Sequence, residues 1–388
     1  MSLRLHTLIM YAAVLVLVTL GFFYIIGRDP GEIALQNIDG PATSTPVQVA
    51  AVEASLQVPP PPAPAAIPPK TTVATTTIKK APIQAPPAQT QPDNQALRIK
   101  NPYSFPASSF ETINTQTRPA LVNIFCAPRT GGTLSPISGS GVLIDPRGVI
   151  LTNAHVAQYV LLAQSGRVNL SCTVRIGAPA APKWNAEILY IPPVWVEAHA
   201  DEITSAHPKG TGEHDYALLR ITGSIDGAPL PAALPYVPVD VRDGIGFKGD
   251  QVLVVSYPAE FLAPSEKFNM YPASSITVIG QLMTFLTKTV DIISLGGIIE
   301  AQGGSSGGAV VNPWGRLVGM ISTTSEGETT ADRDLRALTL SYIDRDLAQQ
   351  SRFDIATTLG GDIAAEALDF NTNVAPKLID LYLERISR

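Results

Sequence analysis

Gly304-Ser305-Ser306-Gly307-Gly308 is the stretch that decides the fold, because it places a serine hydroxyl in a tight glycine-rich turn. The turn leads into the apolar run Ala309-Val310-Val311 and, after a second turn, into Leu317-Val318-Gly319-Met320-Ile321. A flexible linker of glycine and serine would not lead into two apolar strands. We therefore expect a folded, serine-bearing loop.

Two further motifs precede this loop. The first is Thr152-Asn153-Ala154-His155-Val156, and the second is His214-Asp215-Tyr216-Ala217-Leu218-Leu219. Serine is a poor nucleophile until a histidine accepts its proton, and a carboxylate fixes the tautomer of that histidine. The three motifs thus supply His155, Asp215 and Ser306 as a candidate nucleophilic triad, whereas singly each could be an ordinary strand-end or turn residue.

The chain order of these residues excludes two rival folds. An α/β-hydrolase needs its catalytic histidine after the serine, but the last histidine is His214. The subtilisin order needs an aspartate before the histidine. The nearest acid upstream of His155 is Asp145, in the turn-like sequence Asp145-Pro146-Arg147-Gly148.

On these motifs, roughly residues 107–343 resemble the trypsin-like (chymotrypsin-fold) serine proteases, in the bacterial form without a PDZ domain. The resemblance implies an all-β domain of two six-stranded antiparallel Greek-key β-barrels. The first barrel would span about residues 115–225 and the second about 245–343. The cleft between them would bring His155 and Ser306 together.

Alternating and apolar runs predict the strands of both barrels. The predicted strands cover 121–126, 141–144, 149–151, 168–176, 186–191 and 216–221, then 251–256, 275–280, 282–285 and 291–299, besides the two runs after the serine. Asp145-Pro146-Arg147-Gly148 and Asn312-Pro313-Trp314-Gly315 share the residue types of a type I turn.

The resemblance also implies a role for each site residue. Ser306 would attack a peptide carbonyl, His155 would act as general base and then general acid, and Asp215 would orient the imidazole. The backbone N–H groups of Gly304 and Ser306 would form the oxyanion hole. Ser305 stands where the digestive enzymes carry an acid that pairs with a newly cut amino terminus, so we expect activity without zymogen cleavage.

Substrate contacts are predicted at three residues. Glu300 lies six residues before Ser306, where the family often places the base of its specificity pocket, and a carboxylate there would prefer Lys or Arg at the cleavage site. Because this loop varies in length between branches of the family, a solvent-facing position is the favoured interpretation. Ser322 and Thr323 follow the strand after the nucleophile, where relatives pair with the substrate backbone. An exposed loop is the alternative for both.

Cys126 and Cys172 fall in strands that the resemblance implies are neighbours, which leaves a disulfide and two buried free thiols as alternatives. His199, His207 and His214 crowd the segment before Asp215 but follow no fixed metal-ligand spacing. We expect a loop there, with no metal and no cofactor.

The amino-terminal third differs in character from the rest. Residues 1–6 are predicted to be cytoplasmic and 7–26 to form a transmembrane signal anchor, because Leu8 to Ile26 has no charge and would nearly span a core of about 30 Å. A cleaved signal peptide is the alternative. Residues 27–106 are rich in Pro, Thr and Ala and predict a disordered linker.

After residue 343 the pattern becomes helical, over Tyr342 to Gln350, Asp362 to Leu368 and Pro376 to Ile386. The tail, 344–388, is too short for a PDZ module. The sequence as a whole predicts a single-pass membrane serine endopeptidase, extracytoplasmic and acting on proteins or peptides. The competing hypothesis is a non-catalytic, membrane-tethered binding protein. A net charge of −6 argues against nucleic acid as a partner.

Overall fold

The computed structural model of the chain describes residues 99, 101–129, 134–205, 210–243, 246–263, 269–285 and 288–387. The predicted cytoplasmic segment 1–6, the anchor 7–26 and the linker as far as residue 98 lie outside these residues. Within the part of the chain that is described, no helix combines the length and the apolar character that a membrane crossing requires.

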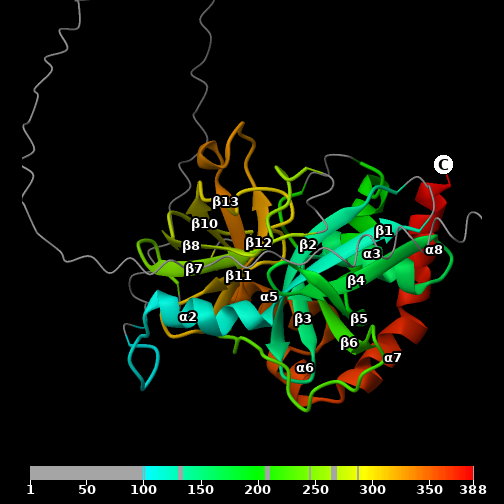
Figure 1. The fold of residues 1–388 in the computed structure, drawn as a ribbon, viewed down its shortest axis with the longest axis horizontal. Helices are drawn as coiled ribbons and strands as arrows, with labels where there is room; N and C mark the ends of the chain where they lie inside the picture. The colour runs from blue at the N-terminus through cyan, green and yellow to red at the C-terminus, as the bar shows by residue number, and fades with distance from the viewer. Residues whose placement is uncertain are drawn as a thin grey trace, which may run out of the picture. The chain divides into compact units, whose positions relative to one another are not determined.

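The first half of the domain is a closed, six-stranded antiparallel barrel with strand order β1-β2-β3-β6-β5-β4 (Figure 1). Its strands are β1 (Leu121–Pro128), β2 (Ile137–Asp145), β3 (Val149–Thr152), β4 (Leu170–Ile176), β5 (Ala181–Tyr190) and β6 (Ala217–Ser224). β4 lies beside β1, which gives the β4-β1-β2-β3 arrangement of a Greek key. The predicted first barrel is confirmed.

The turn between β2 and β3 shows why these short runs fold as they do. Gly148 donates its N–H to the Asp145 carbonyl at 3.0 Å and has φ of +94°, which glycine adopts without strain. Asn312 and Gly315 repeat this bond at 3.0 Å between β11 and β12. Both turns predicted from sequence are therefore present.

The second half is a seven-stranded sheet with the order β8-β7-β11-β12-β13-β10-β9. Its strands are β7 (Gln251–Ser256), β8 (Ala273–Val278), β9 (Leu282–Met283), β10 (Ile292–Gly296), β11 (Ala309–Val311), β12 (Leu317–Thr324) and β13 (Leu335–Thr339). The expected closed barrel of six strands is corrected in two respects: β13 was not predicted, and β8 and β9 are the edges of an open sheet.

The physical reason lies in the connection from β8 to β9. Gly280 donates to the Ser294 carbonyl at 2.8 Å, and Ser294 donates to the Gln281 carbonyl at 2.9 Å. This connection therefore bonds to β10 outside the regular ladder, and β8 and β9 stay at the two ends of the sheet without pairing with each other.

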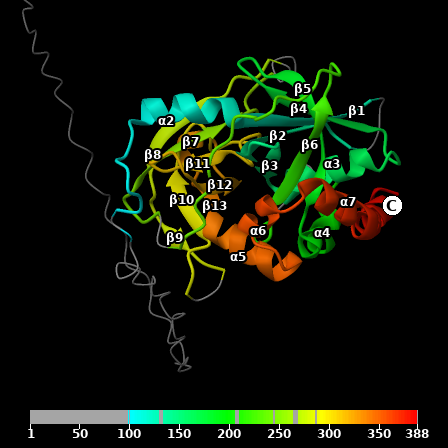
Figure 2. The same cartoon turned by 90° about the horizontal axis from the view of Figure 1, so that it is seen from below.

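Helices cover the strands at several places (Figure 2). They are α2 (Phe110–Thr117), α3 (Ala154–Gln164), α4 (Pro193–His199), α5 (Leu340–Ser351), α6 (Ile355–Gly360), α7 (Ile363–Asn373) and α8 (Ala375–Ile386), with short 3-10 helices at Arg118–Ala120, Ala200–Glu202 and Thr330–Asp332. The three predicted carboxy-terminal helices are present as α5, α7 and α8. α7 packs on β5, and α8 packs on α3 and α4.

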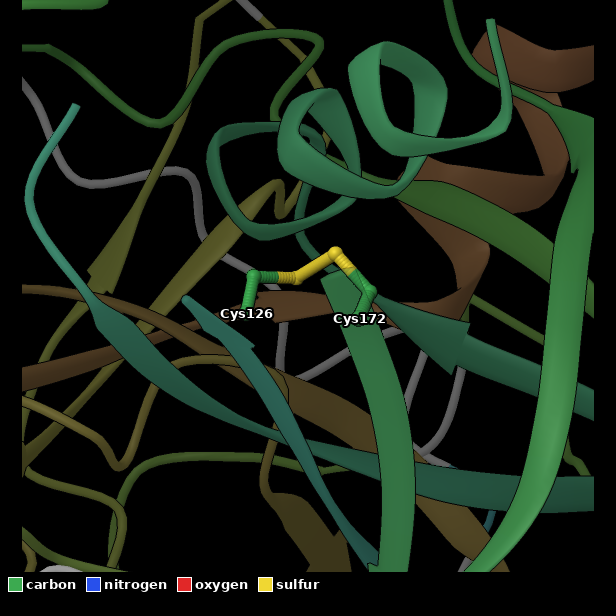
Figure 3. Close-up of a disulfide and its surroundings, with 2 residues drawn as sticks. All are labelled: Cys126 and Cys172. Carbon is green, nitrogen blue, oxygen red and sulfur yellow. A yellow bond between two sulfur atoms is a disulfide. The ribbon is translucent and has the colours of Figure 1, made fainter. Parts of the chain in front are cut away.

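A disulfide joins the neighbouring strands β1 and β4 of the first barrel (Figure 3). Cys126 and Cys172 are directly opposite in the antiparallel register, with their Cα atoms 4.0 Å apart. Of the two alternatives left open by the sequence, the structure has the bonded pair.

Candidate active site

The ends of two neighbouring strands bring His155 and Asp215 together. β3 ends at Thr152, which is opposite Ala217 at the start of β6. Asn153 is the N-cap of α3, which begins at Ala154, so His155 lies in the first turn of this helix, directly beyond the strand. Asp215 immediately precedes β6 and reaches the same barrel end. Residues 60 apart in sequence thereby become neighbours.

Two hydrogen bonds join His155 and Asp215. Nδ1 of the imidazole lies 2.8 Å from Oδ2 of Asp215, and the backbone N–H of His155 donates to Oδ1 at 3.0 Å. Burial by itself would lower the pKa of His155, but the charge and hydrogen bond of Asp215 outweigh burial and raise it. Burial would likewise raise the pKa of Asp215, and its bonds to His155 lower it instead.

Two further side chains hold the Asp215 carboxylate. Asn153 donates from Nδ2 to Oδ2 at 3.2 Å and to the Asp215 carbonyl at 2.8 Å. The Ser322 hydroxyl donates to Oδ2 at 3.0 Å. Asn153 was missed by the sequence reasoning, and the only signal for it was its place beside His155. Ser322 was predicted as a substrate contact, yet it is buried and bonded to Asp215.

Ser306 lies in the loop between β10 and β11, and this loop is bonded to the first barrel. Its carbonyl accepts from the backbone N–H of Ser140 in β2 at 2.7 Å. A Cβ on Gly307 would lie 2.0 Å from the Ser140 carbonyl oxygen, and φ of Gly307 is +86°. Glycine at 307 is therefore what allows the serine loop to approach β2 so closely.

Ser322 also links Asp215 to Ser306. The Ser306 hydroxyl donates to the Ser322 carbonyl at 3.5 Å, while the Ser322 hydroxyl bonds to Asp215. No hydrogen bond joins Ser306 to His155, although both lie among the described residues. The structure thus connects all three triad candidates, but it connects Ser306 to the pair through Ser322.

The predicted oxyanion donors are available. The backbone N–H groups of Gly304 and Ser306 donate to no protein acceptor in the described part of the chain. Gly304 has φ of +92°, and a Cβ there would lie 2.7 Å from the Cβ of Ala259 and 2.8 Å from the Tyr257 carbonyl oxygen. Ser305 is fully buried and accepts a hydrogen bond from the Ser256 hydroxyl at 3.0 Å.

Glu300 is fully buried, so the solvent-facing alternative for this residue is wrong. Burial raises the pKa of its carboxyl group, and the nearby Ser275 hydroxyl opposes this shift. Neither carboxylate oxygen has a partner with hydrogen-bond geometry. A carboxylate in this setting is costly because burial penalises the ionised form.

The variant Glu300→Gln is expected to be more stable than the wild type at neutral pH, by about 1–2 kcal/mol. A carboxyl whose pKa is raised in the folded state favours folding below its unfolded pKa and loses that contribution as pH rises through the folded pKa. The gain should therefore shrink towards acidic pH. Urea unfolding between pH 4.5 and 8 measures it. The exposed Glu328→Gln is the control, and an equal gain in both variants would contradict the assignment.

A second histidine–aspartate pair lies beside the first. Nδ1 of His214 is 2.8 Å from Oδ2 of the buried Asp346 in α5, and the His214 backbone N–H donates to the Tyr342 hydroxyl at 2.9 Å. The Asp346 hydrogen bond raises the pKa of His214. His214 has φ of +58°, a left-handed conformation. Among the described residues, no cluster of His, Cys, Asp and Glu is arranged to hold a metal ion.

Ser322 and Thr323 lie where β12 has a partner strand on one side. Thr323 pairs with Arg336 of β13, whereas the register with β11 ends at Ala309–Met320. Beyond Ile321, no described strand pairs with the other edge of β12. Thr323 is half-buried there.

Comparison with known proteins agrees with this arrangement. Residues 139–320, which contain His155, Asp215 and Ser306, match the family model of the trypsin-like peptidase domain. No curated protein matches the chain. A serine endoprotease from Yersinia pestis is similar in structure, with 19% identity over 64% of this chain and 68% of that one, and a TM-score of 0.41. The similarity to a trypsin-like peptidase domain thus rests on residues 139–320, the segment that contains all three triad candidates.

Proposed function

We propose that the chain is a serine endopeptidase that hydrolyses peptide bonds through Ser306, His155 and Asp215. The observation that carries the proposal is the doubly bonded His155–Asp215 pair, whose Oδ2 bonds to the same residue, Ser322, that accepts from the Ser306 hydroxyl. The family match supports serine peptidase chemistry in general. The residue roles are our inference from the contacts.

In the proposed reaction, the Ser306 hydroxyl attacks the scissile carbonyl while Nε2 of His155 takes its proton. The imidazolium then gives that proton to the leaving amine, and an acyl-enzyme forms on Ser306. Asp215 holds the proton on Nδ1 and stabilises the positive ring. For this step the hydroxyl must leave the Ser322 carbonyl and approach Nε2 of His155. Catalytic hydrogen bonds between a serine hydroxyl and a histidine commonly shorten only when substrate is bound.

The two unpaired N–H groups of Gly304 and Ser306 are the proposed oxyanion donors. Because Ser305 is a buried, uncharged serine bonded to Ser256, it offers no carboxylate to a newly cut amino terminus. We therefore propose a peptidase that needs no zymogen cleavage. No part of Glu300 reaches solvent, so we do not assign it to the substrate pocket. We assign substrate backbone contact to Thr323 and to the carbonyl of Ser322, on the edge of β12 that no described strand covers.

Fluorophosphonate labelling of the full-length chain tests the proposal. The reagent forms a covalent adduct with an activated serine, so we expect labelling that is lost in Ser306→Ala and kept in Ser224→Ala. Absence of Ser306-dependent labelling would favour the second candidate, a non-catalytic protein-binding domain. That candidate is motivated by the bond of the Ser306 hydroxyl to Ser322 in place of His155.

The variant Gly304→Ala is expected to label about 10²–10³-fold more slowly, the usual cost of losing one oxyanion donor. The added methyl would overlap Ala259 and Tyr257 and cannot share the φ of +92°, so the peptide must rotate. Labelling rates measure the effect. The control Gly223→Ala adds a methyl where no atom lies within 4 Å and should label normally. Equal rates in both variants would exclude Gly304 as a donor.

We further propose that residues 7–26 anchor the chain in a membrane and that the peptidase domain lies outside the cytoplasm. The support is the uncharged stretch from Leu8 to Ile26 and its separation from the domain by the proline-rich segment. Membrane fractions washed with alkaline carbonate should retain the chain, and removal of residues 1–26 should release it. Protease added outside spheroplasts should digest the domain; protection would reverse the orientation.

A further inference from the structure

One ion pair, between Glu260 and Arg333, is bonded to the loop that carries Gly304. Arg333 donates from Nη1 to Oε2 of Glu260 at 2.7 Å and from Nη2 to Oε1 at 2.8 Å. Such a two-point contact fixes orientation as well as distance. The Arg333 side chain is 12% exposed and that of Glu260 is 38% exposed, so the pair is largely covered on the arginine side.

The same two side chains bind the serine loop. Oε2 of Glu260 accepts from the backbone N–H of Gly303 at 2.8 Å, and Nη1 of Arg333 donates to the Ala301 carbonyl at 3.1 Å. The Gly303 carbonyl in turn accepts from the N–H groups of Ala259 and Glu260 at 2.8 and 3.1 Å. Both backbone polar groups of Gly303 are thus bonded, so the Gly303–Gly304 peptide is held through its carbonyl while its N–H, that of Gly304, stays free.

Arg333 also holds the loop from which it comes. Its Nε donates to the Gly327 carbonyl at 2.9 Å, across the loop between β12 and β13. The 3-10 helix Thr330–Asp332 in that loop is closed by a capping box between Thr329 and Asp332. Three segments distant in sequence, after β7, before Ser306 and before β13, therefore meet at one pair of charges.

We propose that Glu260 and Arg333 are positioning residues that hold the Gly303–Gly304 peptide in the conformation that presents the Gly304 N–H to an oxyanion. This inference rests on the proposed function. It assigns to an internal ion pair the task for which Ser305 has no carboxylate, namely to build the oxyanion loop in the uncut chain. Neither residue touches the reacting atoms, so each acts through Gly303 and Ala301.

The test compares fluorophosphonate labelling kinetics of the full-length wild type with Glu260→Ala, Glu260→Gln, Arg333→Ala and the double Ala variant. We expect the saturating rate constant to fall about 10–100-fold in Glu260→Ala, because a misplaced donor loses much of its transition-state contribution. The half-saturating concentration should change less than about threefold, since ground-state binding is untouched. The double variant should be no slower than the slower single variant.

Glu260→Gln keeps an oxygen acceptor for Gly303 and should fall between the wild type and Glu260→Ala. The matched control is Glu187→Ala, which breaks the Arg220–Glu187 pair in the first barrel. That pair has contacts of 2.8 and 2.5 Å, with 26% and 30% of its side chains exposed. The Glu187→Ala variant should lose about as much thermal stability as Glu260→Ala, and its labelling rate should equal that of the wild type.

The outcomes separate this inference from the proposed function. If Ser306 of the wild type is never labelled, both fail. If the wild type labels and Glu260→Ala labels as fast as Glu187→Ala, the peptidase proposal stands and the positioning role is overturned. If Glu260→Ala does not fold, Glu260→Gln and Arg333→Ala decide: labelling at the wild-type rate in both variants would also overturn the positioning role.

Discussion

Replacing His155 by alanine is expected to reduce kcat by about 10⁶-fold, the scale seen when the general base of a serine peptidase triad is removed. Without the imidazole, the Ser306 hydroxyl keeps its proton and its bond to the Ser322 carbonyl. Acyl-enzyme formation from an activated p-nitrophenyl ester, followed by stopped flow, measures the loss. The Asp215 carboxylate keeps its bonds to Asn153 and Ser322, so circular dichroism should still report a folded domain.

His199→Ala is the matched control for this experiment. His199 lies at the end of α4, stacks on Trp195 and bonds to its carbonyl at 2.9 Å, away from the triad candidates. Its removal should leave the ester reaction at the wild-type rate. A fall of less than about tenfold in folded His155→Ala would mean that another group accepts the Ser306 proton.

Asp215→Asn is expected to reduce kcat by about 10⁴-fold at neutral pH, because the amide can stabilise the wrong imidazole tautomer. The pH dependence should also change. Asp215 raises the pKa of His155 against the effect of burial, so its neutralisation should lower that pKa. Since the neutral ring is the base, the acid limb of kcat/KM should move to lower pH in the variant. A pH profile of ester hydrolysis measures both changes.

Asp346→Asn is a matched control for Asp215→Asn. Asp346 is 5% exposed, as is Asp215, and each lies 2.8 Å from Nδ1 of a histidine. The control should lose stability while keeping kcat within about tenfold of the wild type. Equal losses in the two variants would mean that Asp215 has only a structural role.

Local sequence accounts for most of the fold of the first barrel. Short runs of Val, Ile and Leu between turn residues predict β1 to β6, and the turn at Asp145 has the expected bond. β13 was missed because Leu335-Arg336-Ala337-Leu338-Thr339 breaks strict alternation and leads straight into a helix. Its strand conformation comes from pairing with β10 and β12, a contact that the local pattern does not contain.

The candidate site divides in the same way. The residue types and order of His155, Asp215 and Ser306 were readable because their motifs are local. The burial of Glu300 was not readable, since it depends on packing by distant strands. Glu260 and Arg333 are 73 residues apart and carry no local signal either. Charged residues in loops are usually solvent-exposed, and the contact between these two exists only because the fold brings three distant loops together.

The carboxy-terminal helices leave the second sheet and finish on the first barrel. β13 runs directly into α5, and Asn371 of α7 donates to the Ile188 carbonyl of β5 at 2.8 Å, while Tyr382 of α8 is fully buried. The carboxy-terminal helices thereby connect the second sheet to the first barrel, the two halves that share the candidate site. Cooperativity follows: we expect one calorimetric transition for both sheets, and deletion of 363–388 should split it into two.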